Sequence, residues 1–314
     1  MTRHIVRSIT TGRRNDRLKK IFGIGTVVVD HVVQLPSFPE RDTKTTVERH
    51  WRQIGGPVPV ALSTASFYGA ETVFLGRWGD DEAGRFIAEG LAARGLDVGP
   101  CRSDVDWSTG FAHVWIDSAT GTRTIAYSRG EFPPADEHDV EPRTISGCGI
   151  LHLDGSSPVA SLRAARLMKE QGGLVVLDAG SWKLGMDDLM PLVDLLIASE
   201  LFRRSRFEDE DVVPERVLEL GSRSVIATSG AQGASYFDGQ QTLHQPALPI
   251  DAIDSNGAGD IFSGAILYSM ANGWPIDMGL RFATAVAGWA CTQKGNSTLP
   301  DSSDVERILR EISG

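Results

Sequence analysis

The stretch whose residue types and spacing could do chemistry is Asp254-Ser255-Asn256-Gly257-Ala258-Gly259-Asp260. It follows the extended apolar segment 247–253 and precedes the apolar run Ile261–Met270, which stops at Asn272-Gly273. This order predicts a strand, a glycine-rich turn and a helix. Small residues at 257–259 leave backbone N–H groups uncovered at the helix start, where the helix dipole also favours negative charge. Such a turn suits a phosphate, or an oxygen that gains negative charge in a transition state.

Asp260 falls in the first turn of the same predicted helix. A carboxylate beside anion-binding amides is poorly explained as an anion ligand. It is well explained as a base that takes a proton from a hydroxyl group while the amides hold a phosphoryl group. The alternative is that Asp260 only complements the positive end of the helix dipole. The chemistry of the residues leaves both interpretations open.

The seven-residue motif resembles the C-terminal signature of the ribokinase-like (PfkB) carbohydrate kinases, and the resemblance runs from about Phe22 to Pro300. It implies that Gly257, Ala258 and Gly259 form the anion hole for the transferring phosphoryl group. It also implies that Asp260 is the catalytic base on the acceptor hydroxyl. Within the family, the pattern is most similar to the branch that contains ketohexokinase and sulfofructose kinase.

Composition limits the class of protein. The chain has 314 residues, of which 41% are hydrophobic and 23% charged, as expected for a soluble protein with a large core. A net charge of −10 argues against general nucleic-acid binding and is compatible with a nucleotide site. Cys101, Cys148 and Cys291 form neither a disulfide framework nor a zinc pattern, so we expect a reducing cytoplasm. No apolar run approaches the ~18 residues that span a membrane.

Residues 1–20 differ from the rest because they are rich in Lys and Arg and contain one acid, Asp16. No apolar segment follows, so this is not a secretory signal. We interpret the segment as a disordered basic extension or as the product of a start codon placed too early, with a transit peptide as the remaining alternative. A single kinase domain is expected over 21–314.

The elements that must position the motif come from alternating strand and helix patterns, which continue from Ile150 onward. They predict a mainly parallel sheet covered by helices on both faces, and the resemblance implies the three-layer ribokinase-like α/β fold. Sites in such folds lie beyond the carboxyl ends of the strands, where Asp30, Asp154, Asp178 and Thr228 fall. Asp154 and Asp178 could serve a substrate or a metal, or be ordinary strand-end residues.

Two further regions alternate as half-exposed strands do. One is Thr43–Trp51, and the other is Gly110–Ile116 followed by a turn and Arg123–Tyr127. Together they predict a small antiparallel sheet, from about 35–52 and 107–130, that stands off from the main body. The resemblance implies that this sheet is a lid over the sugar and that it joins two copies of the chain in a homodimer.

Five residues are candidates for binding the acceptor. Asp30 lies in the apolar run Ile21–Val33, which predicts a buried strand, so it is either a solvated strand terminus or, as the resemblance implies, a ligand of sugar hydroxyls. The resemblance also implies that the Gly55-Gly56 pair touches the sugar and that Arg123 reaches the sugar or the phosphates, although an exposed strand arginine is an equal alternative for Arg123. Lys44 occupies the place of a sulfonate-contacting lysine in sulfofructose kinases.

The chain also departs from the family at the acceptor site. Pro59 or Val60 stands where most members have an asparagine that contacts the sugar, and Asp154-Gly155-Ser156 stands where sulfofructose kinases have an arginine. We therefore expect a sugar, with a fructose-like ketose favoured and an anionic sugar as an option. A nucleoside kinase and a non-catalytic sugar- or nucleotide-binding regulator are the alternatives.

Further segments resemble the family's nucleotide site. Thr228, Gly230 and Gly233 match the turn that contacts the ATP phosphates and ribose, and the small-residue helix with Thr284 and Gly288 matches the adenine site, where tight helix packing is the alternative. Ser199-Glu200-Leu201-Phe202 replaces the Asn-x-x-Glu motif that organises Mg²⁺. The resemblance implies ATP and Mg²⁺, without a nameable protein ligand for Mg²⁺. It also suggests a K⁺ site near Asp254, Asn256 and Cys291.

Overall fold

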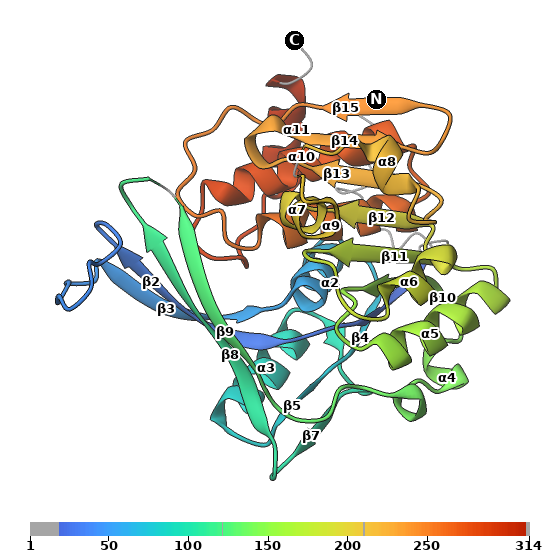
Figure 1. Cartoon of the computed structure of the whole chain (residues 1–314), viewed down its shortest axis with the longest axis horizontal. Coiled ribbons are helices and arrows are strands. Elements are labelled where there is room, and N and C mark those ends of the chain that lie inside the picture. The colour runs from blue at the N-terminus through green and yellow to red at the C-terminus, as the bar shows by residue number, and fades with distance from the viewer. Residues whose placement is uncertain (1–18, 121, 210, 312–314) are drawn as a thin grey trace.

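The computed structural model describes residues 19–120, 122–209 and 211–311. These residues form a three-layer α/β body and a small sheet that stands off from it (Figure 1). The predicted basic extension lies outside the described residues except for Lys19 and Lys20, and Lys20 begins the first strand. No helix within these ranges is both long and apolar enough to cross a bilayer.

The predicted central sheet is confirmed. In the described ranges it has nine strands in the order β15-β14-β13-β12-β11-β10-β1-β4-β6, parallel from β13 to β6, with β14 and β15 antiparallel at one edge. The parallel strands are apolar over most of their length because helices cover both faces. The strands are β1 (Lys20–Ile24), β4 (Thr72–Leu75), β6 (Leu96–Asp97), β10 (Cys148–Leu153), β11 (Leu174–Ala179), β12 (Leu195–Ala198), β13 (Val225–Thr228), β14 (Ala234–Phe237) and β15 (Thr242–Gln245).

Two apolar cores lie on opposite faces of this sheet, because successive side chains of a strand point to opposite sides. Ile21 belongs to one core and Phe22 to the other. The first core is closed by α2 (Pro57–Phe67), α3 (Glu82–Ala93), α9 (Ala258–Ala271), α10 (Ile276–Cys291) and α11 (Ser302–Glu311). The second is closed by α4 (Pro142–Ile145), α5 (Pro158–Glu170), α6 (Met186–Leu189), α7 (Glu200–Phe207) and α8 (Pro214–Leu218).

The predicted lid is also present. It has four strands in the order β3-β2-β8-β9, with bounds β3 (Arg49–Gly55), β2 (Val28–Leu35), β8 (Ser108–Asp117) and β9 (Arg123–Glu131). The β2–β3 and β8–β9 pairs are antiparallel, as predicted, whereas the middle β2–β8 pair is parallel. A further small pair, β5 (Arg77–Gly79) with β7 (Arg102–Asp104), lies beside it.

The prediction of one buried strand over Ile21–Val33 is wrong. The chain leaves the central sheet after Ile24 and enters the lid at Val28. Asp154 Oδ2 accepts a hydrogen bond of 2.8 Å from the amide of Thr26 and so holds the crossing. Both strands are apolar, so the pattern alone could not show that the chain changes sheets.

Two other expected strands differ. Most of Thr43–Trp51 is a loop, and the lid strand begins only at Arg49, so Lys44 is not on a strand. Segment 247–253 is irregular, since Pro246 and Pro249 lack the N–H donors that a strand needs. The amides of Ile253 and Asp254 instead bond to the carbonyl of Cys291, at 2.8 and 3.1 Å. The glycine-rich turn therefore follows a loop anchored on the end of α10.

Candidate active site

The glycine-rich turn leads into α9 as the sequence predicts. Gly257 precedes the helix with φ 81°, which glycine adopts without strain, and it offers no side chain to cap the first amides. The amide of Ala258 donates to the Ser255 carbonyl at 3.3 Å, and the amide of Ile261 donates to the Gly257 carbonyl at 2.9 Å. A Cβ placed on Gly259 would meet no atom within 4 Å. The first turn of α9 is therefore uncovered on this side, with its early amides free of side-chain caps.

Asp260 is half-buried in this first turn. Burial raises the pKa of its carboxyl group well above the usual value, and the negative charges of Asp178, Asp30 and Asp154 raise it further, whereas Arg123 opposes the shift. A raised pKa makes this carboxylate a stronger base than an exposed aspartate. The electrostatic environment is therefore suited to proton abstraction.

Asp178 ties this acidic group to the central sheet. Its carboxylate, near the end of β11, accepts a hydrogen bond of 2.6 Å from Ser263 Oγ, which is on α9 one turn beyond Asp260. Burial raises the pKa of Asp178 to about 6, Asp154 adds to the shift and Lys183 opposes it. The structure thus brings both of the uncertain strand-end aspartates into the surroundings of Asp260.

Asp30 approaches the same turn from the lid. Its buried carboxylate accepts hydrogen bonds from Gln53 Nε2 on β3 and from Asn256 Nδ2 in the glycine-rich turn, both at 3.3 Å. Burial is the main reason that the pKa of Asp30 is raised. Gly55 leaves room for the Asp30 carboxylate, because a Cβ at residue 55 would lie 2.2 Å from Asp30 Oδ1. Gly56 has φ 111° and starts α2.

Arg123 forms a second bridge between the lid and the turn. Its Nη1 donates to Ser255 Oγ at 2.9 Å and to the Ser255 carbonyl at 3.3 Å. Lys44, in contrast, is exposed in the loop between β2 and β3, beyond Leu35, whereas Asp30 and Gly55 lie at the opposite end of the paired strands. The structure therefore joins Asp30 and Arg123 to the turn by hydrogen bonds, whereas Lys44 lies in the exposed loop at the end of the lid that also carries Arg123.

The predicted K⁺ region is well ordered by its own hydrogen bonds. Asp254 accepts from the amides of Asn256 and Gly295, at 2.8 and 3.0 Å, and the Cys291 carbonyl accepts from the loop amides described above. The buried Asn296 Oδ1 has no hydrogen-bond partner among the described residues, so one oxygen here is available to a ligand. No group of three His, Cys, Asp or Glu side chains in these ranges is arranged to hold a metal ion.

The nucleotide candidates of β12 and β13 lie together at the carboxyl edge of the sheet. Thr228 ends β13, and Gly230 and Gly233 take φ of 45° and 95° in the turn that follows. Ser199 caps α7, since its Oγ accepts from the amide of Phe202 at 3.0 Å. No pattern in the sequence indicated the buried Arg203, which donates to the carbonyls of Ala198 and Thr228, each at 3.0 Å, and so joins the two strand ends.

Thr284 and Gly288 lie on α10, as predicted. Thr284 is buried, and a Cβ on Gly288 would lie 2.8 Å from Leu248 Cδ1. Leu248 belongs to the loop that precedes the glycine-rich turn. The small residues of α10 therefore allow this loop to pack closely, and binding of adenine beside them stays a prediction.

Three further polar residues that shape the site carry little or no signal in the sequence. Gln53 and Asn296 were hidden because their roles depend on contacts between distant segments: Gln53 donates to Asp30, and Asn296 Nδ2 donates to the carbonyl of Ile54 at 2.8 Å. Lys183 lies in the loop after β11 and donates to the carbonyl of Asp154. Its position after a predicted strand end was the one available signal.

Comparison with known proteins gives one consistent family. The model described as pfkB family carbohydrate kinase matches residues 18–302. A ribokinase from Arabidopsis thaliana is 26% identical over 307 residues, covering 91% of this chain and 80% of its own length. An aminoimidazole riboside kinase from Salmonella typhimurium is 30% identical over 273 residues, with coverages of 78% and 84%. A ketohexokinase from Mus musculus is 24% identical over 296 residues, with coverages of 88% and 97%.

Solved structures agree on the fold. A structure of Arabidopsis thaliana ribokinase complexed with ribose and ATP has a TM-score of 0.77 at 25% identity, covering 93% of this chain and 99% of that one. An Escherichia coli protein described as a ribokinase II, in complex with ATP and Mg²⁺, has a TM-score of 0.80 at 23% identity, with coverages of 94% and 100%. These matches confirm the resemblance found in the sequence: the chain is a phosphotransferase with an alcohol group as acceptor, and it belongs to the pfkB family of carbohydrate kinases.

Proposed function

We propose that this kinase transfers the γ-phosphoryl group of ATP to a primary hydroxyl group of a sugar, with Asp260 as the catalytic base. The observation that carries the proposal is the position of Asp260 in the first, uncapped turn of α9, with a pKa raised by burial and by neighbouring aspartates. Complementing a helix dipole does not require the buried, acid-rich surroundings found here.

In the proposed reaction, Asp260 accepts the proton of the acceptor hydroxyl while that oxygen attacks the γ-phosphorus. The new O–P bond forms as the bond from phosphorus to the β,γ-bridging oxygen breaks, and ADP leaves with the electron pair. Amides of the Gly257-Ala258-Gly259 turn hold the negative charge on the transferring group. This is phosphoryl transfer by positioning and electrostatics, without a covalent enzyme intermediate.

The nucleotide is proposed to lie along the carboxyl edge of β12 and β13. The glycines of the turn after Thr228 allow backbone to approach the phosphates, and Ser199, Thr284 and Gly288 complete the predicted site. Mg²⁺ would neutralise phosphate charge. Because the described residues hold no three-residue metal cluster, the phosphates and water are its expected ligands. K⁺ binding near Asp254, Asn256 and Cys291 is supported by the unpartnered Asn296 Oδ1.

The acceptor is proposed to lie between the lid and α9, with Asp30 and the Gly55-Gly56 pair on its hydroxyl groups and Arg123 at the reacting end. Support comes from the contacts that join these residues to the glycine-rich turn. Lys44 would have to reach the sugar from an exposed loop, so its predicted role has no comparable support. We favour a fructose-like ketose as the acceptor.

A riboside is the second candidate for the acceptor. It is favoured by the similarity to aminoimidazole riboside kinase, whose name describes an acceptor of that class. The test is a screen of ATP-dependent ADP release over ketoses, aldoses, sugar acids, sugar phosphates and nucleosides, with the product identified by mass spectrometry. A ketose phosphorylated on a primary hydroxyl supports the proposal. A nucleoside as best acceptor would favour the second candidate, and ATP binding without turnover on any acceptor would favour a non-catalytic regulator.

A further inference from the structure

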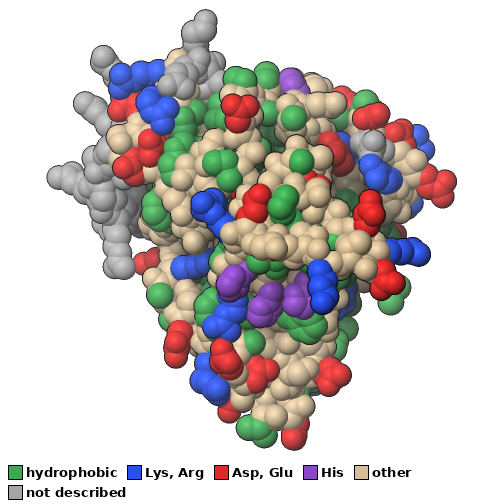
Figure 2. All heavy atoms as spheres, turned by 90° about the vertical axis from the view of Figure 1, so that its left-hand side faces the viewer, with side chains coloured by type: hydrophobic (Ala, Val, Ile, Leu, Met, Phe, Trp, Pro, Cys, Tyr) green, Lys and Arg blue, Asp and Glu red, His purple; other side chains and the backbone are tan. Residues whose placement is uncertain are grey.

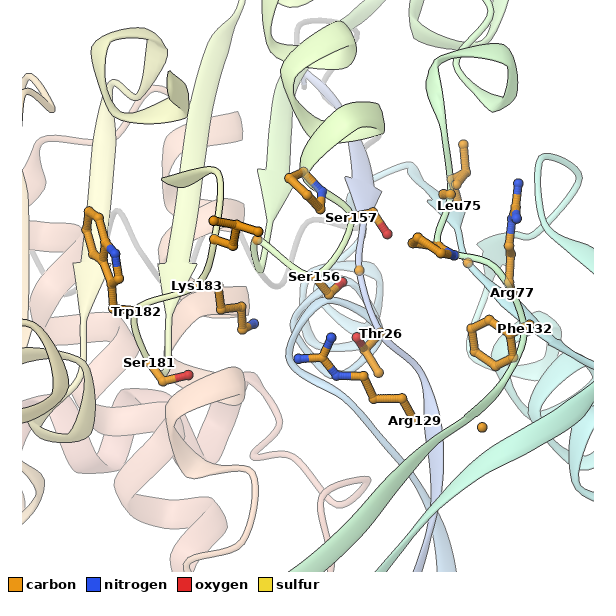
Figure 3. A pocket seen from close by; sticks show the side chains of 18 residues that line it. Thr26, Leu75, Arg77, Arg129, Phe132, Ser156, Ser157, Ser181, Trp182 and Lys183 are labelled. Atoms are coloured by element: carbon orange, nitrogen blue, oxygen red, sulfur yellow. The ribbon is translucent and has the colours of Figure 1, made fainter. Parts of the chain in front are cut away.

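A cavity of about 620 Å³ opens beside the proposed acceptor site, at the carboxyl edge of β1, β4, β10 and β11. Its size falls within the range of about 300–1,000 Å³ that is typical of small-molecule pockets. Its walls come from the segments that follow these four strands and from the end of the lid strand β9. Figure 3 shows this cavity with Thr26 and Ser156 at its centre.

Two cationic side chains enter the cavity from different elements. Arg129 comes from β9 of the lid and Lys183 from the loop after β11, and their charged ends point toward Thr26 and Ser156 (Figure 3). Arg129 is exposed, and no carboxylate among the described residues pairs with it. Lys183 donates to the Asp154 carbonyl and keeps further donors. Two positive charges from separate elements therefore share one hollow.

A third cation on the wall is already neutralised. Arg77 pairs with the buried carboxylate of Asp139 and donates to the Pro133 carbonyl at 2.9 Å. Its guanidinium group points away from the centre of the cavity in Figure 3. The charge of Arg77 is therefore balanced within the protein, whereas no carboxylate among the described residues balances the charge of Arg129.

A polar side chain without a partner points to a ligand as well. Ser156 Oγ is buried and has no hydrogen-bond partner within the described part of the chain. It lies just before α5, whose N-cap residue, Ser157, makes no side-chain cap, so the positive end of that helix also faces this wall. A buried hydroxyl, two cations and a helix start together fit an anion better than a neutral group.

Asp154 links the wall of the cavity to the surroundings of Asp260. Asp154, one of the aspartates that raise the pKa of Asp260, bonds through its two carboxylate oxygens to the amides of Thr26 and Ser156, each at 2.8 Å. The positive charge of Lys183 lowers the pKa of Asp178. An acceptor whose hydroxyl group lies on Asp260 can therefore extend its other end into this cavity.

We propose that the cavity binds an anionic group, a carboxylate or a phosphate, at the end of the acceptor remote from the hydroxyl that is phosphorylated, with Arg129 and Lys183 as its charge partners. The inference rests on the proposed function, because it assumes that an acceptor lies on Asp260. It narrows the substrate class to sugar acids or sugar phosphates, and it places the specificity in β9 and the 181–184 loop rather than at Lys44.

The test compares acceptors that share the reacting end and differ at the other: a neutral sugar, the matching sugar acid and the matching sugar phosphate. We expect the wild-type protein to prefer one of the anionic acceptors by at least about tenfold in kcat/KM. Arg129→Gln and Lys183→Gln should each lower kcat/KM for that acceptor by about 10- to 100-fold, the size expected for a hydrogen bond to a charged group. For Arg129→Gln the loss should be in KM, and kcat/KM for the neutral sugar should stay within about twofold.

Arg49→Gln is the matched control, since Arg49 is an exposed lid arginine on β3 outside the cavity, and it should leave every acceptor unchanged. Arg129→Lys keeps the charge and should retain most of the preference. The sugar acid and the sugar phosphate distinguish the two sources of the anion. Equal losses for neutral and anionic acceptors, or a wild-type protein without an anion preference, would overturn this inference and leave the kinase proposal standing. Absence of turnover on all acceptors would overturn both.

Discussion

Gly55 and Asp30 are packed so closely that residue 55 has no room for a side chain: a Cβ there would lie 2.2 Å from Asp30 Oδ1 and 2.7 Å from Oδ2. Gly55→Ala should therefore displace the Asp30 carboxylate from Gln53 and Asn256. We expect the acceptor KM to rise at least about tenfold while the KM for ATP stays unchanged, because a hydrogen bond to a charged group is worth about 1.5–3 kcal/mol. Steady-state kinetics with both substrates varied measures this.

Gly99→Ala is the control for that substitution. A Cβ on Gly99 would also meet an aspartate oxygen, Asp97 Oδ1 at 3.0 Å, but this carboxylate is exposed and accepts a hydrogen bond from the neighbouring amide of Gly99 at 2.9 Å. It should behave as wild type. Equal effects of Gly55→Ala on both substrates would argue against a role of Asp30 in acceptor binding.

The pH dependence of turnover should respond in opposite directions to two neighbours of Asp260. Arg123 lowers the pKa of Asp260 and Asp178 raises it. The base must be deprotonated, so activity falls as pH drops through its pKa. Arg123→Gln should move the acidic limb of the kcat/KM profile to higher pH, and Asp178→Asn should move it to lower pH. Shifts in the same direction, or no shifts, would contradict the assignment of this limb to Asp260.

The stability of the fold should depend on pH through His152. This residue lies on β10 with none of its surface exposed, and burial lowers its pKa to about 4. The unfolded chain takes up a proton below about pH 6.5, and the folded chain does so only near pH 4. The contribution of His152 to stability is therefore complete above about pH 6.5 and is lost as pH drops toward 4, by about 3 kcal/mol.

Urea unfolding between pH 4 and 8 measures the His152 effect. His152→Leu should flatten the dependence on pH over this interval, while His138→Gln, at an exposed histidine, should leave it as in the wild type. An unchanged slope in His152→Leu would show that other groups control acid unfolding.

The outer face of the lid is the proposed homodimer interface. His31, His113 and Phe111 lie on this face, with ring centroids 5.5 Å apart for the histidine pair and 5.3 Å for Phe111 and His113. Figure 2 views the molecule from the side that carries the lid in Figure 1 and shows a group of histidine side chains near the middle of that face. Phe111 is 41% exposed, so Phe111→Lys should disrupt an interface without loosening the core.

Analytical ultracentrifugation tests the interface. The wild-type protein should sediment as a dimer and Phe111→Lys as a monomer, with Phe67→Lys, at another exposed phenylalanine, remaining dimeric. A wild-type monomer at micromolar concentration would contradict the lid interface.

The sequence could predict the layers of this fold but not where the chain changes sheet. Repeated apolar strands after Ile150 required a covered parallel sheet, and Asn272-Gly273 marked the end of α9. The run Ile21–Val33 is apolar throughout, so nothing in it revealed that residues after Ile24 join the lid. That division depends on the bond from Thr26 to Asp154, far along the chain.

The site, like the fold, was predictable only in part. Residues at strand ends and helix starts, such as Asp178 and Asp260, could be found because the fold class places them at one edge. Gln53 and Arg203 could not, because their roles depend on which atoms of other segments lie within hydrogen-bond distance. Ser156 could not, because its role depends on the cavity that distant segments form around it. At Lys44 the pattern misled the prediction. The segment around Lys44 alternates like a strand, yet this segment is an exposed loop with no partner strand.

Turnover by Asp260→Asn tests the central claim most directly, because asparagine keeps the shape of the side chain and removes the base. ATP binding should persist, measured by calorimetry, and kcat should fall by about 10²–10⁴-fold, the contribution typical of a positioned base. A variant that binds ATP and turns over its acceptor at near wild-type rate would contradict the account.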